Sequence, residues 1–204
     1  LDKKKGGAIV KAADEALTGQ WNDHFPLVVW QTGSGTQTNM NVNEVLANVA
    51  LEIMGKPKGE YHIISPNDHV NCSQSTNDAY PTAFRVALIN RMISYRKTLI
   101  RLADAFEKKG QELAGVLKMG RTHLQDAVPM SMGDEFKGFA TNLREEVDRI
   151  DAATRLLLEV NMGATAIGTS VNAPTGYPDL VVKRLSEITG LELKLAPDLV
   201  EATS

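Results

Sequence analysis

The chain has 204 residues, of which 43% are hydrophobic and 23% are charged, and its formal net charge is −3. This length is sufficient for one large domain or two small ones with a sizeable core. The sequence has no basic stripe of the kind that binds nucleic acid, and no apolar run of the ~20 residues that span a membrane. We therefore expect neither a nucleic-acid partner nor a membrane.

The cysteine content and the chain ends bear on location and completeness. Cys72 is the only cysteine, which excludes a disulfide within the chain and favours a reducing, cytoplasmic location. The sequence begins with Leu1 rather than Met and ends at Ser204 without an obvious terminator. We expect both ends to be cut, so that the chain is part of a longer protein.

Helical periodicity is the dominant pattern along the chain. Apolar residues recur every three or four positions, which predicts helices over residues 8–17, 42–54, 79–116, 132–160 and 179–189. Gly55 and Gly190 stand where two of these helices would end. Convincing strand alternation is absent, and residues 192–195 form at most one short edge strand. The predicted fold class is mainly α.

The two longest predicted helices carry apolar seams. The first seam is formed by Leu88, Met92, Tyr95, Leu99, Leu102 and Phe106, and the second by Phe136, Phe139, Leu143, Val147, Ile150 and Leu157. Such helices are several times longer than average, and one chain of this size cannot cover them. We therefore expect a long-helix bundle inside a homo-oligomer, with a smaller N-terminal helical and loop domain.

Three loops are dense in small, neutral, hydrogen-bonding side chains and lie near helix ends. They are residues 33–39, 73–78 and 120–126. Hydroxyls, amides and free backbone N–H groups at a helix N-terminus bind anions such as carboxylates. The alternative is plain helix capping, because Ser75 followed by Asp78 fits a capping box. Both interpretations stay open, since a cap and an anion site use the same N–H groups.

The histidines show no metal-ligand spacing with one another or with Cys72, so no metal or other cofactor is expected. His24, His62 and His69 are interpreted as surface or structural residues. His123 differs because it lies in a polar loop between the two long helices. A histidine there can anchor a carboxylate or relay a proton.

Read together, the loops resemble the signature regions of the aspartase/fumarase superfamily. The matching segments are residues 33–44, 66–78, 120–129 and 163–169, in the order and spacing of that family. The resemblance spans essentially the whole chain but under half of a typical family member.

The resemblance implies a homotetramer with a core of long helices and active sites that combine regions from three subunits. It implies anti elimination from a small dicarboxylate, usually releasing fumarate, without a cofactor. It also implies a domain boundary, with residues 1–74 in the N-terminal domain and residues 75–204 in the central long-helix domain. Carried over by position, the substrate-binding residues are Ser34, Thr36, Ser75, Thr76, Asn77, Thr122 and His123, with His123 also catalytic as carboxylate anchor or proton relay.

The family's third signature, a mobile loop that supplies a serine base, is absent from this sequence, so the chain alone is expected to be inactive. Residues 58–61 and 159–164 favour a member that eliminates ammonia from L-aspartate. The sequence of residues 31–37 is more similar to a member that hydrates fumarate to malate. This activity stays as an alternative. An inert helical assembly protein is the alternative of a different class.

Overall fold

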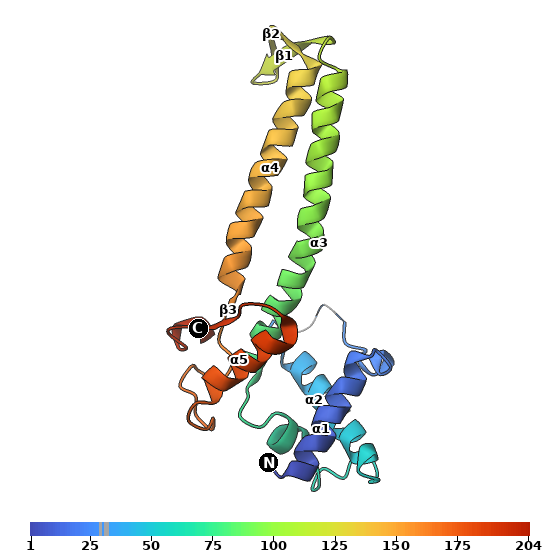
Figure 1. The fold of residues 1–204 in the computed structure, drawn as a ribbon, viewed down its shortest axis with the longest axis vertical. Coiled ribbons are helices and arrows are strands. Elements are labelled where there is room, and N and C mark those ends of the chain that lie inside the picture. Colours follow the sequence, from blue (N-terminus) through green and yellow to red (C-terminus); the bar gives the residue numbers. More distant parts are fainter. Residues whose placement is uncertain (29, 31–32) are drawn as a thin grey trace. The chain divides into compact units, whose positions relative to one another are not determined.

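The structure, a computed structural model, describes residues 1–28, 30 and 33–204 (Figure 1). The chain forms two compact units, one made of Leu1–Phe84 and Glu159–Ser204, the other of Arg85–Leu158. Helices dominate both units, which confirms the predicted mainly α fold. The expected boundary between residues 74 and 75 refers to the domains of a longer protein and stays a prediction.

The core of the first unit lies between α1 (Lys3–Leu17) and α2 (Thr36–Ile53). Small side chains let the two helices approach closely, and bulkier ones close the core around them. Asp2 caps α1 by accepting hydrogen bonds from the backbone N–H groups of Lys4 and Lys5. The buried residues of this core are Ala8, Ala12, Ala47, Val49, Ala50, Leu51, Ile64 and Val70.

Both helices start earlier than predicted. The lysines at the start of α1 are good helix formers behind the Asp2 cap, so this helix begins at Lys3 rather than near residue 8. Residues 36–41 looked like loop because they are polar, yet they form the first turns of α2. Residues 31 and 32 of the expected loop lie outside the described residues.

Short elements complete the first unit. They are η1 (Asn22–His24), the π-helix η2 (Pro66–Val70), β3 (Glu159–Val160), α5 (Tyr177–Thr189), β4 (Lys194–Leu195) and η3 (Glu201–Thr203). The short strand expected within residues 192–195 is confirmed as β4, which pairs in parallel with β3. Gly55 and Gly190 take left-handed conformations after helices, as predicted.

The second unit is an antiparallel helix pair. It contains α3 (Thr76–Glu112) from Arg85 onward and α4 (Met132–Leu157), which lie side by side (Figure 1). Phe106 packs between Phe136 and Phe139, with ring centroids 5.7 and 5.6 Å away. Close to the turn between the helices, a Cβ atom on Gly133 would lie 2.4 Å from the Gly110 carbonyl oxygen. Only glycine permits this approach, and α3 continues through Gly110.

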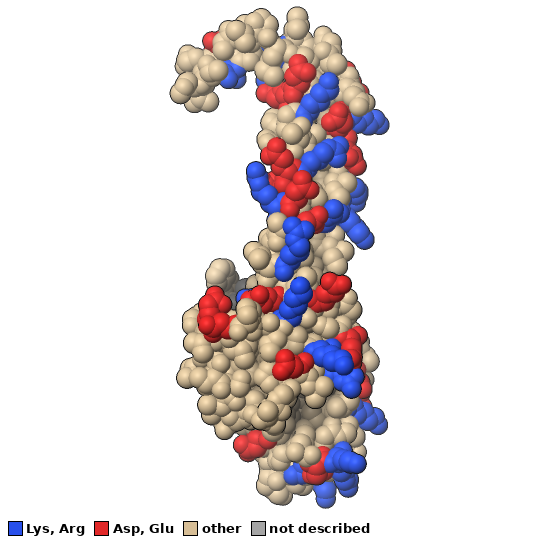
Figure 2. Space-filling model, turned by 60° about the vertical axis from the view of Figure 1, so that its left-hand side comes forward, with Lys and Arg blue, Asp and Glu red and all other residues tan. Residues whose placement is uncertain are grey.

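Charged side chains of both signs cover the outer surface of this helix pair (Figure 2). The Arg96 guanidinium forms two hydrogen bonds with the Asp151 carboxylate, at 2.7 and 2.9 Å, and this contact raises the pKa of Arg96. Arg144 pairs with Asp104 at 3.1 Å. Both pairs join α3 to α4. In the described part of the chain, no helix is both long and apolar enough for a membrane span.

A β-hairpin joins the two long helices, where the sequence predicted a loop without strands. Strands β1 (Leu117–Thr122) and β2 (Gln125–Ser131) pair antiparallel, with a register shift between Met119 and Arg121. The prediction was wrong because the turn residues His123 and Leu124 are not hairpin formers. Both have positive φ, 48° and 63°, a conformation that two-residue turns usually assign to Asn or Gly.

Candidate active site

Helix α3 begins with the capping box that the sequence suggested. The Ser75 hydroxyl accepts a hydrogen bond from the Asn77 backbone N–H at 3.2 Å, and the Asp78 carboxylate accepts one from the Ser75 N–H at 2.9 Å. These contacts hold the consecutive residues Ser75, Thr76 and Asn77 at the helix N-terminus. This is the end of a helix to which anions are attracted.

Asp78 does more than cap the helix. Its side chain is fully buried, and its second oxygen accepts hydrogen bonds from the backbone N–H groups of Gly163 at 3.2 Å and Thr165 at 2.8 Å. Three N–H donors therefore surround one buried carboxylate, which is the condition under which a charge is tolerated inside a protein. The result is a fixed connection between the start of α3 and the loop of residues 161–176.

Asn77 is oriented by the same loop. Its side-chain N–H group donates to the Ala166 carbonyl at 2.7 Å, while its backbone carbonyl accepts from the buried Asn161 side chain at 3.0 Å. The Asn77 side-chain carbonyl is thereby turned away from Ala166. It can accept a hydrogen bond from an ammonium or hydroxyl group of a ligand.

The loop before α2 approaches α3 closely. A Cβ atom at Gly35 would lie 2.4 Å from the Tyr80 ring, and φ at Gly35 is 74°, so glycine is required here. The hydroxyls of Ser34 and Thr36 are 3.3 Å apart, and Ser34 lines a cavity beside the start of α3, whereas Thr36 does not. This cavity of about 450 Å³ is lined by Gly33, Ser34, Thr76, Asn77, Tyr80, Pro81, Phe84 and Thr203.

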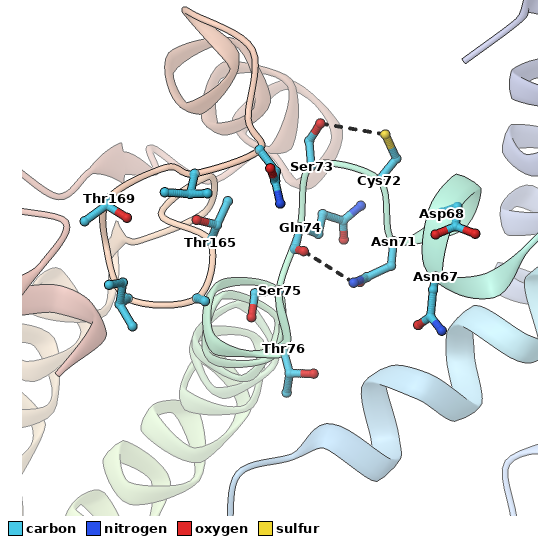
Figure 3. Close-up of a pocket in the computed structure, with 14 residues that line it drawn as sticks. Asn67, Asp68, Asn71, Cys72, Ser73, Gln74, Ser75, Thr76, Thr165 and Thr169 are labelled. Carbon is cyan, nitrogen blue, oxygen red and sulfur yellow. Dashed lines mark hydrogen bonds between the residues drawn. The ribbon is translucent and has the colours of Figure 1, made fainter.

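A larger cavity, of about 750 Å³, lies between the α3 N-terminus and the 161–176 loop (Figure 3). Its described lining residues carry hydroxyl, amide, thiol, carboxylate or apolar side chains. They are Asn67, Asp68, Asn71, Cys72, Ser73, Gln74, Ser75, Thr76, Thr165, Ala166, Ile167, Thr169, Val171 and Asn172. Asp68 carries the only charge among them. Neutral donors at a helix N-terminus suit a reversibly bound carboxylate.

Tyr177 begins α5 and is half-buried. Burial, followed by the negative charge of the Asp78 carboxylate and the nearby Cys72 thiol, raises the pKa of Tyr177 above its ordinary value. Its phenol is therefore neutral at physiological pH. The Thr165 hydroxyl, which belongs to a residue lining the larger cavity, is buried and has no hydrogen-bond partner within the described residues.

Asparagine side chains behind Thr76 were missed by the sequence analysis. Asn39 donates to the Thr76 hydroxyl oxygen at 3.1 Å and to the Asn71 side-chain oxygen at 3.3 Å. Asn43, which is 5% exposed, donates to the same Asn71 oxygen at 3.1 Å. A signal was available, because Asn39 and Asn43 are four residues apart and so share one face of a helix.

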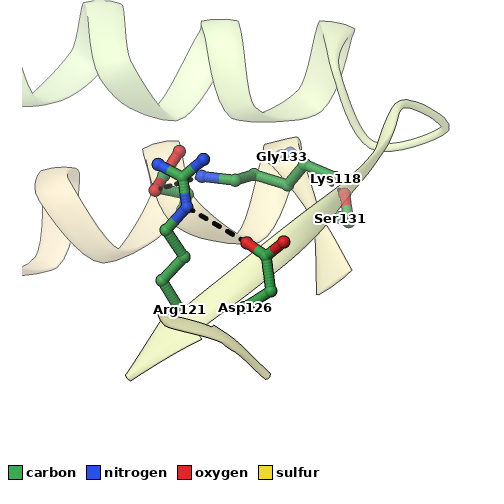
Figure 4. Close-up of polar contacts among 6 residues, drawn as sticks. Lys118, Arg121, Asp126, Ser131 and Gly133 are labelled. Atoms are coloured by element: carbon green, nitrogen blue, oxygen red, sulfur yellow. Dashed lines mark hydrogen bonds and ion pairs between the residues drawn. The ribbon is translucent and has the colours of Figure 1, made fainter. Parts of the chain in front are cut away.

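Thr122 and His123 belong to the second unit, whereas Ser34, Thr36, Ser75, Thr76 and Asn77 belong to the first. Thr122 closes the hairpin by pairing with Gln125, and His123 is exposed at the turn. Beside them, Arg121 pairs with Asp126 at 3.4 Å, and Lys118 pairs with Glu135 at 2.6 Å (Figure 4). The roles assigned to Thr122 and His123 stay predictions.

The remaining histidines make local contacts. The Ser65 backbone N–H donates to His69 at 2.8 Å, His62 lies 3.1 Å from the Glu60 carboxylate, and the His24 ring contacts Trp21. Among the described residues, no group of three or more His, Cys, Asp or Glu side chains is arranged to hold a metal ion.

Comparison with known proteins places these features in a family. The family model described as Lyase matches residues 1–204. The chain belongs to this lyase family. Aspartate ammonia-lyase of Escherichia coli (strain K12) is 53% identical over the whole of this chain, and the match covers 43% of that protein. Fumarate hydratase class II of Thermosynechococcus vestitus is 48% identical over 96% of this chain, which corresponds to 42% of that protein.

A solved structure agrees with the fold. The fumarate lyase:delta crystallin structure from Brucella melitensis matches with a TM-score of 0.91 and 50% identity, covering 100% of this chain and 44% of that protein. The family resemblance drawn from the four signature segments is therefore confirmed. The chain spans about two fifths of the length of the relatives it matches.

Proposed function

We propose that the complete protein containing this chain is a carbon–nitrogen lyase that eliminates ammonia from L-aspartate and releases fumarate. The observation that carries the proposal is the set of neutral donors at the start of α3, held by the buried Asp78 carboxylate. It is supported by 53% identity to a protein named for this activity.

The proposed reaction breaks one C–H and one C–N bond. A base removes a proton from the carbon beside one carboxylate, which gives an enediolate with additional negative charge. The electron pair then forms the C=C bond as the amino group leaves as ammonia. Neutral hydroxyl and amide donors placed where that charge develops stabilise the transition state more than the substrate.

Each predicted site residue has a role in this proposal. The hydroxyls of Ser34, Thr36, Ser75, Thr76 and Thr122 donate to the substrate carboxylates, and the side-chain carbonyl of Asn77 accepts from the substrate amino group. His123 anchors a carboxylate or relays a proton. By the family pattern, the serine base belongs to the third signature segment, which is absent from these 204 residues. The 204 residues alone are therefore expected to release no fumarate.

A homotetramer in the cytoplasm completes the proposal. Apolar side chains on the long helices of the second unit are about half exposed, including Ile93 at 49%, Tyr95 at 53% and Phe139 at 44%. Helices with such faces are stabilised by packing against further helices. Light scattering of the complete protein should give the mass of four chains, and a monomer would contradict this part of the proposal.

The decisive experiment supplies the complete protein with L-aspartate or L-malate and follows fumarate by its ultraviolet absorbance. We expect fumarate from L-aspartate together with an equal amount of ammonia. Fumarate from malate alone would establish the second candidate, a fumarate hydratase, which is favoured by the 48% identical relative of that name. No fumarate from either substrate would favour an inert helical assembly protein.

A further inference from the structure

The side chains of Asn71, Asn39 and Asn43 form a chain of hydrogen bonds whose direction is fixed at one end. The fixed point is the Gln74 backbone carbonyl, which can only accept hydrogen bonds. The Asn71 side chain lies 3.3 Å from it (Figure 3), and must therefore present its N–H group there. Consequently the Asn71 side-chain oxygen points the other way, toward α2.

The orientation of the Asn71 side chain fixes the donor and acceptor groups of the asparagines in helix α2. The Asn71 oxygen can only accept, so both asparagines that contact it must present N–H groups: Asn43 at 3.1 Å and Asn39 at 3.3 Å. Asn39 and Asn43 lie one helical turn apart, which lets both reach the same oxygen. Asn43 is buried and Asn39 and Asn71 are partly buried, so water competes little for these groups.

The last hydrogen bond of this chain runs from Asn39 to the Thr76 hydroxyl. The second N–H of the Asn39 amide contacts the Thr76 hydroxyl oxygen at 3.1 Å. A hydroxyl has one hydrogen to donate, and an oxygen that faces an N–H group does not point its own hydrogen there. Thr76 lines both of the cavities of about 450 and 750 Å³ described above, so its hydrogen is available to a ligand bound there.

We propose that Asn71, Asn43 and Asn39 act as a polarity relay that makes the Thr76 hydroxyl an obligate hydrogen-bond donor to the substrate carboxylate. Asn39 is the positioning residue of this relay, because it alone contacts Thr76 among the three. The proposal rests on the proposed function, since it concerns the same dicarboxylate site. A hydroxyl that rotated freely would present its lone pairs to the carboxylate part of the time, which would weaken binding.

The test measures the Kd of succinate, a non-reacting dicarboxylate, for the complete protein by titration calorimetry. Asn39→Leu removes the N–H group without adding charge, and should raise the succinate Kd about fivefold, the effect of one hydrogen bond of ordinary strength. In a Thr76→Val background the same substitution should change the Kd less than twofold. Asn48→Leu is the matched control, because Asn48 also lies in α2 but contacts Tyr61 and Gly59 instead, and should leave the Kd unchanged.

Asn39→Asp is the second variant, since it keeps the side-chain shape and replaces the donor by an acceptor. It should raise the Kd more than Asn39→Leu, because it attracts the Thr76 hydrogen away from the ligand. Thermal unfolding checks that both variants remain folded.

Each outcome decides the proposal. Unchanged succinate binding in both Asn39 variants would overturn the relay and leave the proposed function intact. An undiminished effect of Asn39→Leu in the Thr76→Val background would also overturn it, because Asn39 would then act without Thr76. A wild-type protein that binds no dicarboxylate would overturn the relay together with the proposed function.

Discussion

Replacing Asp78 by asparagine tests the central connection of the site. The carboxylate accepts three backbone N–H groups, from Ser75, Gly163 and Thr165. An amide of the same shape has one accepting oxygen, so in its better orientation it still serves Gly163 and Thr165 while its NH2 group faces the Ser75 N–H. The substitution therefore leaves at least one buried donor without an acceptor.

The cost follows from these contacts. An unpaired buried donor costs about 1–3 kcal/mol, and the two remaining hydrogen bonds each lose about 1 kcal/mol when the acceptor becomes neutral. The low end of this sum is about 3 kcal/mol. Local opening of the connection should then become roughly 100-fold more frequent.

Hydrogen exchange followed by mass spectrometry provides the assay. Amides in the 161–170 segment of Asp78→Asn should exchange roughly 100-fold faster than in the wild-type protein, and kcat/KM should fall as Ser75 and Asn77 lose their orientation. Asp134→Asn is the control, because Asp134 lies in the first turn of α4 but is exposed. Exchange and kcat/KM within twofold of wild type would refute the assignment of Asp78 as the connection.

Further predictions concern other parts of the site. His123→Ala should lower kcat/KM at least ~10-fold, or about 1.4 kcal/mol, and an unchanged value would show that His123 is not part of the active site. The raised pKa of Tyr177 means that the folded protein keeps this proton when the unfolded chain has lost it, so stability should fall as pH rises above about 10. The difference in tyrosinate absorbance between the wild type and Tyr177→Phe should develop above that pH, and ionisation below it would contradict the burial argument. Gly35→Ala should destabilise the loop by about 1–3 kcal/mol, since it adds a strained φ and a contact with Tyr80, and thermal unfolding with an unchanged midpoint would contradict this.

The long helices were predictable because their apolar residues repeat every three or four positions, and the end of the shorter helix α5 was marked by Gly190. The hairpin was not, because His123 and Leu124 adopt positive φ values that their side chains disfavour. Local patterns cannot report a conformation that surrounding contacts impose. The start of α2 was missed because its first turns carry polar residues, which are typical of a loop in the sequence.

The hydroxyl residues proposed for the site could be named from the sequence because they cluster in short loops, and their roles stay predictions. Their supporting residues were not, since Asp78 acts on Gly163 and Thr165, which are 85 and 87 residues away. Asp78 was interpreted as a cap, which it is, but two of the three hydrogen bonds to its carboxylate come from a distant segment. Hydrogen-bond direction in the Asn71 network likewise depends on which groups meet in three dimensions.

The discontinuous first unit has a consequence for protein synthesis. The ribosome completes Asp78 long before it makes Gly163 and Thr165, because residues 85–158 come between. At elongation rates of about 5–20 residues per second, this delay is roughly 4–17 s. During that time the carboxylate has only its Ser75 contact and stays hydrated. The start of α3 therefore gains its full set of hydrogen bonds late on the nascent chain, after the helix pair has been synthesised.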